Sequence, residues 1–484
     1  MNRRRRPSSL ILAILGLAAV VGWSPARAAG VATTVRPPAA PDSEDKQRPN
    51  RIAGELGFAR IDGDLFTTTV LYGDFRFGDA ALGVQLPLRL RIFDLGPKDD
   101  RSDFEIRHQD WDETGDWTRF LRFFQWGKPG EALYLRVGEL TGASLGHGTI
   151  VDQYYNSLLT NHWQPGLRAD LDLGIAGGQL FVSDLTALDI LGGRAFVRPF
   201  DRFKAPILRS VTLGATVVAD ASAAGAHFTD ASGQVQLDDM ERIVTEIDPL
   251  VVYGVDLGVE IFRNRFMEIV PYLDWNFLAN GRGRLDGGLH LGLFLHVHPT
   301  GSLLDWLLKY EMRVYRGAYI PAYFNTLYEV ERLDFRPDSI APSGRAPKGE
   351  TVRSVLRDPL STTGHYLFAD LSVLDRIRVA AVVEVLEETA GGAVAFWVQT
   401  PWLAGLRADA FYTKRNMRSP LDLFEADRAL AILSMKYLVL DPLYVFVNYE
   451  RQWYLAADAW KPGADSIYET VNDFSLGAGF EKRF

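Results

Sequence analysis

The last twelve residues of the chain, DFSLGAGFEKRF, alternate between two kinds of position. Counting back from Phe484, every second residue is apolar as far as Phe474, with Lys482 as the exception. The intervening positions are charged residues, serine or glycine. A repeat of two places neighbouring side chains on opposite faces of a β-strand. The chain therefore ends in a strand with one apolar and one polar face, and an aromatic residue completes the apolar face.

The same alternation recurs upstream, and from residue 51 onward no repeat of helical period appears. The clearest segments are 167–173, 251–262, 285–298 and 377–386. In 251–262 the alternation predicts Ile261 on the apolar face and Phe262 on the other. A transmembrane barrel needs such strands, with apolar side chains toward lipid and polar ones toward the lumen. The alternative is a β-sandwich, which would bury its apolar face in protein.

The lengths of the connections separate these alternatives. Very short turns are expected at 77–80, 128–130, 263–265, 375–376 and 441–442, and long polar segments at 95–116, 141–165, 221–249, 318–364, 415–427 and 456–472. If each strand crosses a membrane once, starting at residue 51, every long segment lies on one side and every short turn on the other. Short periplasmic turns with long outer loops are typical of membrane barrels, whereas a sandwich predicts no such segregation.

The amino terminus has the pattern of a secretory signal. Four arginines at 3–6 precede an apolar run at 10–21, and Ala26, Arg27 and Ala28 form a small-residue cleavage site. The run is shorter than the roughly 20 residues of a spanning helix, although an uncleaved anchor is the alternative. We therefore expect a signal peptide at 1–28, a flexible periplasmic segment at 29–50 and one barrel domain at 51–484.

Composition excludes several classes of protein. The chain has no cysteine, which excludes a lipoprotein anchor, a disulfide framework and a thiolate metal site. Loss of the five arginines of the signal peptide would change the formal charge from −9 to −14. So acidic a chain argues against nucleic acid as a partner.

Together, the signal peptide, the alternating strands, the asymmetry of the loops and the terminal Phe484 resemble a Gram-negative outer-membrane β-barrel of porin type. The resemblance implies an all-β fold, a transmembrane antiparallel up-and-down barrel of about 20 strands, with 18 as the alternative. It implies no cofactor, contact with membrane lipid and lipopolysaccharide, and recognition of the last strand, through Phe480 and Phe484, by the barrel-assembly machinery. Whether the barrel is a monomer or a trimer stays open.

Charged residues on the polar faces are candidates to line the lumen, since a cation facing lipid would cost about 2–4 kcal/mol at the membrane midplane. They are Arg89, Arg91, Arg136, Arg168, Asp170, Asp256, Glu260, Asp274, Arg378, Glu384, Arg407 and Asp409. Such a mixed set resembles the cross-lumen ladders that set size and ion preference in porins. The lumen must therefore be filled with water or closed by a plug formed of protein.

Two loops are candidates for a constriction. Segment 138–156 is rich in glycine and could fold back across the barrel mouth, or form an outer turn. The first half of 318–364 is too aromatic for a solvated loop. Its candidate constriction residues are Tyr319, Tyr323, Tyr328, Glu329 and Arg332. The alternative is an external hairpin that caps the barrel.

Motifs for catalysis and metal binding are weak. Ser144, His147 and Asp152 lie close in sequence without a recognised triad spacing. The calcium-loop pattern that begins at Asp110 has Leu121 where a bidentate glutamate is required. His290, His296 and His298 share one strand face without an evident carboxylate partner. We therefore expect passive diffusion of small polar solutes or ions, with no catalysis. An adhesin or receptor acting through outer loops is the alternative, and a barrel enzyme is less favoured.

Overall fold

The computed structural model describes most of the expected barrel. The described residues are 50–61, 64–95, 104–111, 114–158, 163–227, 245–279, 285–298, 304–316, 319–332, 361–374, 377–386, 392–417, 419–424, 429–455 and 468–484. The expected signal peptide 1–28, the segment that follows it up to residue 49, and residues 333–360 of the longest connection lie outside this set.

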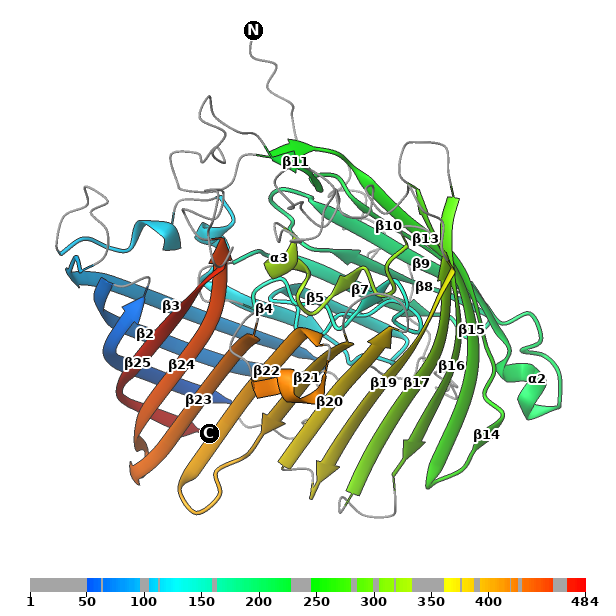
Figure 1. Ribbon diagram of the computed structural model, residues 1–484. Coiled ribbons are helices and arrows are strands. Elements are labelled where there is room, and N and C mark those ends of the chain that lie inside the picture. Colours follow the sequence, from blue (N-terminus) through cyan, green and yellow to red (C-terminus); the bar gives the residue numbers. More distant parts are fainter. Residues whose placement is uncertain are drawn as a thin grey trace, which may run out of the picture.

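The strands form one closed antiparallel barrel in which each strand of the wall pairs with its neighbours (Figure 1). The sheet holds 21 strands, but β14 (Phe262–Arg263) continues the line of β13 along β15, so 20 strands build the wall. These are β1 (Arg51–Ile61), β2 (Asp64–Phe77), β3 (Ala80–Phe93), β4 (Leu121–Trp126), β5 (Leu133–Gly138), β7 (Gly166–Asp172), β8 (Ala176–Val182), β9 (Ile190–Val197), β10 (Thr212–Asp220), β13 (Leu250–Gly258), β15 (Met267–Ala279), β16 (Leu285–Val297), β17 (Leu304–Arg316), β19 (Ser361–Val373), β20 (Ile377–Leu386), β21 (Gly392–Gln399), β22 (Leu406–Met417), β23 (Ala429–Leu440), β24 (Leu443–Leu455) and β25 (Tyr468–Arg483). The predicted fold class is confirmed.

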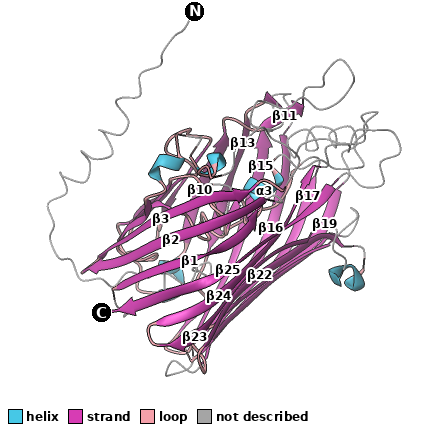
Figure 2. Cartoon of the chain, turned by 90° about the vertical axis from the view of Figure 1, so that its left-hand side faces the viewer, coloured by secondary structure: helices cyan, strands magenta, loops and turns pink. Residues whose placement is uncertain are grey.

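The barrel closes where the first strand meets the last. β1 and β25 pair antiparallel from Arg51 opposite Arg483 to Arg60 opposite Phe474 (Figure 2). Closure leaves no strand edge, so that the backbone groups of the wall are satisfied within it. The predicted assembly-signal residues Phe480 and Phe484 are both exposed, on the outward side of this seam.

Burial alternates along the strands as the sequence predicts. Val255 is 52% exposed on the outer surface, whereas the adjacent Asp256 is 8% exposed inside. The prediction for Phe262 is wrong. Gly258 pairs with Tyr272, but Phe262 pairs with Ile269, so the register shifts by one residue between β13 and β14. This shift turns Phe262 to the exposed outer surface.

Alternating strand directions place the connections at two ends. The described strands that flank the six long segments meet them at one end, called here the loop end, and the strands that flank the five predicted short turns meet them at the other, the turn end. One long connection at the turn end was not predicted: residues 198–211, between β9 and β10, contain the short helix α2 (Pro206–Ser210). No helix among the described residues is long and apolar enough to cross a membrane.

The β1–β25 seam depends on two glycines. Gly57 lies opposite Gly477, and a Cβ on either would overlap the backbone of the partner strand at Leu476 or Leu56. We expect Gly477→Ala to destabilise the barrel by about 1–3 kcal/mol, because the seam must open to accept the methyl group. Urea unfolding in lipid vesicles would measure the change. Gly178→Ala is the matched control, since its added Cβ meets its nearest atom at 3.4 Å. Equal midpoints for the two variants would contradict the prediction.

Candidate functional site

Two long loops fold into the barrel and pair with each other. One connects β5 to β7 and the other connects β17 to β19. Their short strands β6 (Val151–Asp152) and β18 (Phe324–Asn325) run parallel, with Val151 opposite Phe324. The backbone N–H of Phe324 donates to the carbonyl of Ile150 at 3.1 Å. Residues 139–158 and 319–332 are called here the two-loop body. The sequence left open whether these loops fold into the barrel or form an outer turn and an external hairpin. In the described residues, both loops fold inward.

An apolar core holds this body against the barrel wall. Tyr319, Tyr323 and Phe324 are almost fully buried, and the ring of Tyr154 meets that of Phe181 on β8 edge-on at 5.0 Å. The wall residues of this core include Phe181, Val218, Val252, Leu278 and Tyr315. Leu327 extends the body toward the opposite wall, where it packs with Phe411 and Leu430 of β22 and β23. The two-loop body therefore bridges the lumen from one side of the barrel wall to the other.

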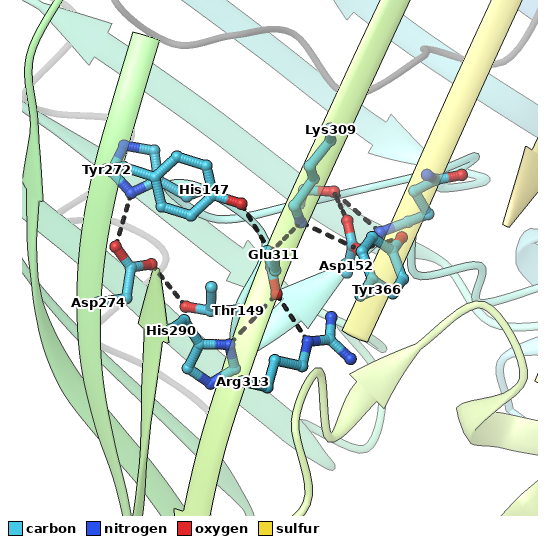
Figure 3. Close-up of polar contacts among 12 residues, drawn as sticks. His147, Thr149, Asp152, Tyr272, Asp274, His290, Lys309, Glu311, Arg313 and Tyr366 are labelled. Carbon is cyan, nitrogen blue, oxygen red and sulfur yellow. Dashed lines mark hydrogen bonds and ion pairs between the residues drawn. The ribbon is translucent and has the colours of Figure 1, made fainter. Parts of the chain in front are cut away.

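Polar contacts anchor the first loop to the wall, and Figure 3 shows those of three loop residues. The carboxylate of Asp274 on β15 lies 2.8 Å from His147 Nδ1 and accepts a hydrogen bond from Thr149 Oγ1 at 2.6 Å. Asp152 accepts a hydrogen bond from the Tyr366 hydroxyl at 2.9 Å and lies 3.4 Å from Lys309 Nζ. All these side chains are buried, so the loop is fixed by charge-assisted hydrogen bonds shielded from solvent.

The carboxylate of Glu311, on β17, is the centre of this network (Figure 3). It accepts hydrogen bonds from Arg313 Nε and the Tyr272 hydroxyl, each at 2.7 Å. Lys309 Nζ lies 2.9 Å from it, and His290 Nδ1 lies 3.2 Å from it. Glu311 is fully buried. Lys309, Glu311 and Arg313 were not among the residues predicted from the sequence, although three charges at alternate positions of one strand are a signal that could have indicated them.

In its described part, the second loop is also anchored around α3 (Tyr328–Glu331). The Tyr328 hydroxyl donates to Asp220 at the end of β10, and the Tyr154 hydroxyl donates to Glu329. Burial, together with the neighbouring Glu329 carboxylate, raises the pKa of Tyr154 well above its ordinary value. Tyr154 therefore remains a hydrogen-bond donor at neutral pH. Arg332 completes the anchor, with NH1 3.5 Å from Asp189. The five predicted constriction residues thus fix the body in place.

The predicted pore-lining charges face inward but pair locally. Eleven of the twelve lie on strands, and Glu260 lies between β13 and β14, where it pairs with Arg263 at 3.2 Å. The other contacts are Arg89–Asp110, Arg91–Asp64, Arg136–Gln125, Arg168–Asp170, Arg194–Asp256, His147–Asp274, Arg378–Asp370, Arg313–Glu384 and Arg407–Asp409. These contacts join groups along the same stretch of wall or tie a loop to it. They therefore differ from the expected ladders across the lumen.

The residues considered for catalysis and metal binding have separate partners. Ser144 Oγ lies 3.4 Å from Asp152, whereas His147 contacts Asp274. His290 contacts Glu311, and His296 Nε2 lies 2.9 Å from Asp305. Among the described residues, no group of three or more histidine, aspartate and glutamate side chains could hold a metal ion.

The inner face formed by β23, β24 and β25 has a different character. Ser434 Oγ donates to the Asn448 side-chain oxygen at 2.7 Å, and Asn448 Nδ2 donates to Ser475 Oγ at 3.1 Å. These three small polar side chains, called here the polar row, are all partly exposed to solvent. Toward the turn end, Lys436 Nζ lies 2.5 Å from Glu55 on β1. The row was not predicted from the sequence, because the spacing of Ser434, Asn448 and Ser475 along the chain does not show that strand pairing brings them together.

No protein-family model matches the chain, and no curated protein matches it. Among solved structures, it is similar to Wzi, an outer-membrane protein of Escherichia coli involved in group 1 capsule assembly and described as a carbohydrate-binding β-barrel. The identity is 10%, with 90% of this chain and 85% of Wzi covered and a TM-score of 0.31. It is also similar to OccK11 of Pseudomonas aeruginosa, with 10% identity, 92% and 97% covered and a TM-score of 0.33.

A third similar structure is OmpT, an outer-membrane protein of Vibrio cholerae, with 8% identity, 90% and 97% covered and a TM-score of 0.28. Such low identities and scores say nothing about substrate or mechanism. The closed wall of this chain has an apolar exterior and a polar interior. The chain folds as a closed antiparallel β-barrel of the kind that spans membranes.

Proposed function

We propose that this protein is a porin-type channel for passive diffusion of small polar solutes or ions. The observation that carries the proposal is the polar row of Ser434, Asn448 and Ser475, which is partly exposed on the inner face of the barrel. The two-loop body packs on the wall from β8 to β17 and reaches the far wall at Phe411 and Leu430. The proposed path runs beside this body, along β23, β24, β25 and β1.

The chemistry of this face suits a path for water and small solutes. Glycines 57 and 477 lie beside the polar row and add no side chain to the lumen. The row offers hydroxyl and amide groups that can replace part of the hydration of a passing solute. Small groups of this kind leave more room than the buried aromatic residues of the opposite wall.

The proposal implies further partners and a setting. The loop end would face the cell exterior and the turn end the periplasm of a Gram-negative bacterium, after removal of residues 1–28. Membrane lipid, lipopolysaccharide and the assembly machinery, which would read Phe480 and Phe484, would be its partners. The proposed function includes no catalytic activity and no binding of nucleic acid.

Single-channel conductance of the mature protein in a planar bilayer tests the proposed path. We expect ohmic openings, and we expect Ser434→Trp and Ser475→Trp each to reduce the conductance at least about twofold, because an indole would obstruct the path. Val447→Trp is the matched control, since Val447 lies next to Asn448 on β24 but faces outward. A folded, inserted and silent wild-type barrel would overturn the proposal.

A second function is favoured by one observation. The two-loop body is fixed by buried contacts at Asp274, Asp152 and Asp220, and it also touches the far wall at Phe411. Such a body suits a receptor or adhesin that keeps its lumen closed and binds through its outer loops. A silent barrel that binds cells or lipopolysaccharide, and loses binding when the loops of the loop end are shortened, would support this second function.

A further inference from the structure

The connection 198–211 is unlike the others at the turn end. It joins β9 to β10 through α2, whereas the other connections at this end contain between two and eight residues. Figure 1 shows α2 standing outside the barrel wall. A connection that only had to reverse the chain would not need this length.

The segment exposes apolar and basic side chains together. Four large apolar residues are each between 39% and 52% exposed: Phe200, Phe203, Ile207 and Leu208. The rings of Phe200 and Phe203 meet edge-on at 5.4 Å, so they form one surface. Three cations are exposed around them: Arg202, Lys204 and Arg209. Asp201 is the one acidic residue of the segment, and it is partly buried.

Contacts with the wall fix this segment at both ends. At its start, Arg198 NH1 and NH2 donate to the two carboxylate oxygens of Asp172, at 2.7 and 2.8 Å. At its end, the Ser210 hydroxyl accepts a hydrogen bond from the backbone N–H of Glu260 at 2.9 Å. The apolar side chains are therefore held outward, where they cannot collapse onto the wall.

We propose that residues 200–209 insert into the phospholipid leaflet at the turn end and anchor this side of the barrel in the membrane interface. The exposed surface is continuous with the lipid-facing wall, because Val197 before it and Leu213 after it are paired and exposed outward. Aromatic and aliphatic side chains would enter the boundary between headgroups and acyl chains. The cations would contact phosphate groups and attract anionic lipids.

This inference rests on the barrel fold and is independent of conduction. A soluble partner at the turn end is the competing occupant, and the test separates the two. Because the chain has no cysteine, single-cysteine variants can be labelled without background. We would attach a nitroxide at Phe203→Cys and Ile207→Cys, reconstitute the full barrel in vesicles of phosphatidylethanolamine and phosphatidylglycerol, and measure accessibility to oxygen and to a nickel chelate.

Leu213→Cys provides the lipid-facing reference, and Asp79→Cys, in the exposed turn between β2 and β3, provides the aqueous reference. The ratio of oxygen to nickel accessibility at positions 203 and 207 should exceed that at 79 at least about twofold. Changing Arg202, Lys204 and Arg209 together to glutamate should move both labels toward the aqueous value. Labels at 203 and 207 that match position 79 in the unchanged background would overturn the proposal and indicate a soluble partner.

Discussion

Replacing Glu311 with glutamine is expected to lower the free energy of unfolding by about 3–5 kcal/mol. Glu311 is fully buried between Lys309 and Arg313, whose side chains are no more than 4% exposed. Glutamine keeps the size of the side chain but removes its charge. Two buried cations would then share Asp152 and the partly exposed Glu384 as their remaining acidic partners. Removing one partner from a buried charge network leaves charge uncompensated, which accounts for the size of the effect.

Unfolding by guanidinium in lipid vesicles, followed by tryptophan fluorescence, would measure this loss. The matched control is Asp409→Asn, which also removes an inward-facing carboxylate. Its partner Arg407 lies 3.2 Å away and is 24% exposed, and Asp409 itself is 30% exposed. Solvent screens such a pair, so its loss should cost less than about 1 kcal/mol. Equal effects of the two substitutions would show that the Glu311 network does not stabilise the barrel as proposed.

The barrel could be predicted because its signals are local and repeated. Val255 and Asp256, or the residues between Phe474 and Phe484, show their faces through neighbours alone, and the lengths of the connections are visible in the sequence. The register near Phe262 could not be predicted, because a one-residue shift between β13 and β14 depends on the pairing with β15. A period of two carries no information about such a shift.

The candidate site was predictable only in part. The aromatic character of Tyr319, Tyr323 and Tyr328 indicated a packed loop, but not that it would pair with residues 150–152 of another loop. That pairing joins segments more than 170 residues apart, and it is decided by tertiary contacts such as those of Asp152 with Lys309 and Tyr366. The inward-facing charges were recognised, but their partners follow from strand order and could not be read from spacing.

The inner surface of the barrel is divided into a buried, stabilising side and a partly exposed polar side. Wall residues from β8 to β19 surround an apolar core and a buried charge network, whereas β23, β24 and β25 present the polar row. A rigid body on one side can fix the width of a path on the other without a gate. In the proposed channel, the buried charges around Glu311 would position the constriction, and the polar row would form the surface that solutes contact.

Removing the second loop should therefore widen the proposed channel. Replacing residues 319–332 by a short glycine-serine linker removes Tyr319, Phe324 and Leu327, and with them the contact to the far wall at Phe411 and Leu430. The first loop would lose its partner at Val151. We expect single-channel conductance to rise at least about twofold, because the remaining barrel of 20 strands is wide enough for an aqueous channel.

Shortening residues 419–424 is the matched control for loop removal. This segment of the loop end contains the short helix η4 (Pro420–Phe424), and its side chains Leu421 and Phe424 are 75% and 84% exposed, so the conductance should not change. Both variants must first be shown to fold, by their resistance to urea. A folded barrel lacking residues 319–332 with unchanged conductance would mean that the two-loop body does not limit the path. If that variant conducts while the unaltered barrel is silent, the two-loop body is a plug. That result would favour the receptor function and contradict the open channel.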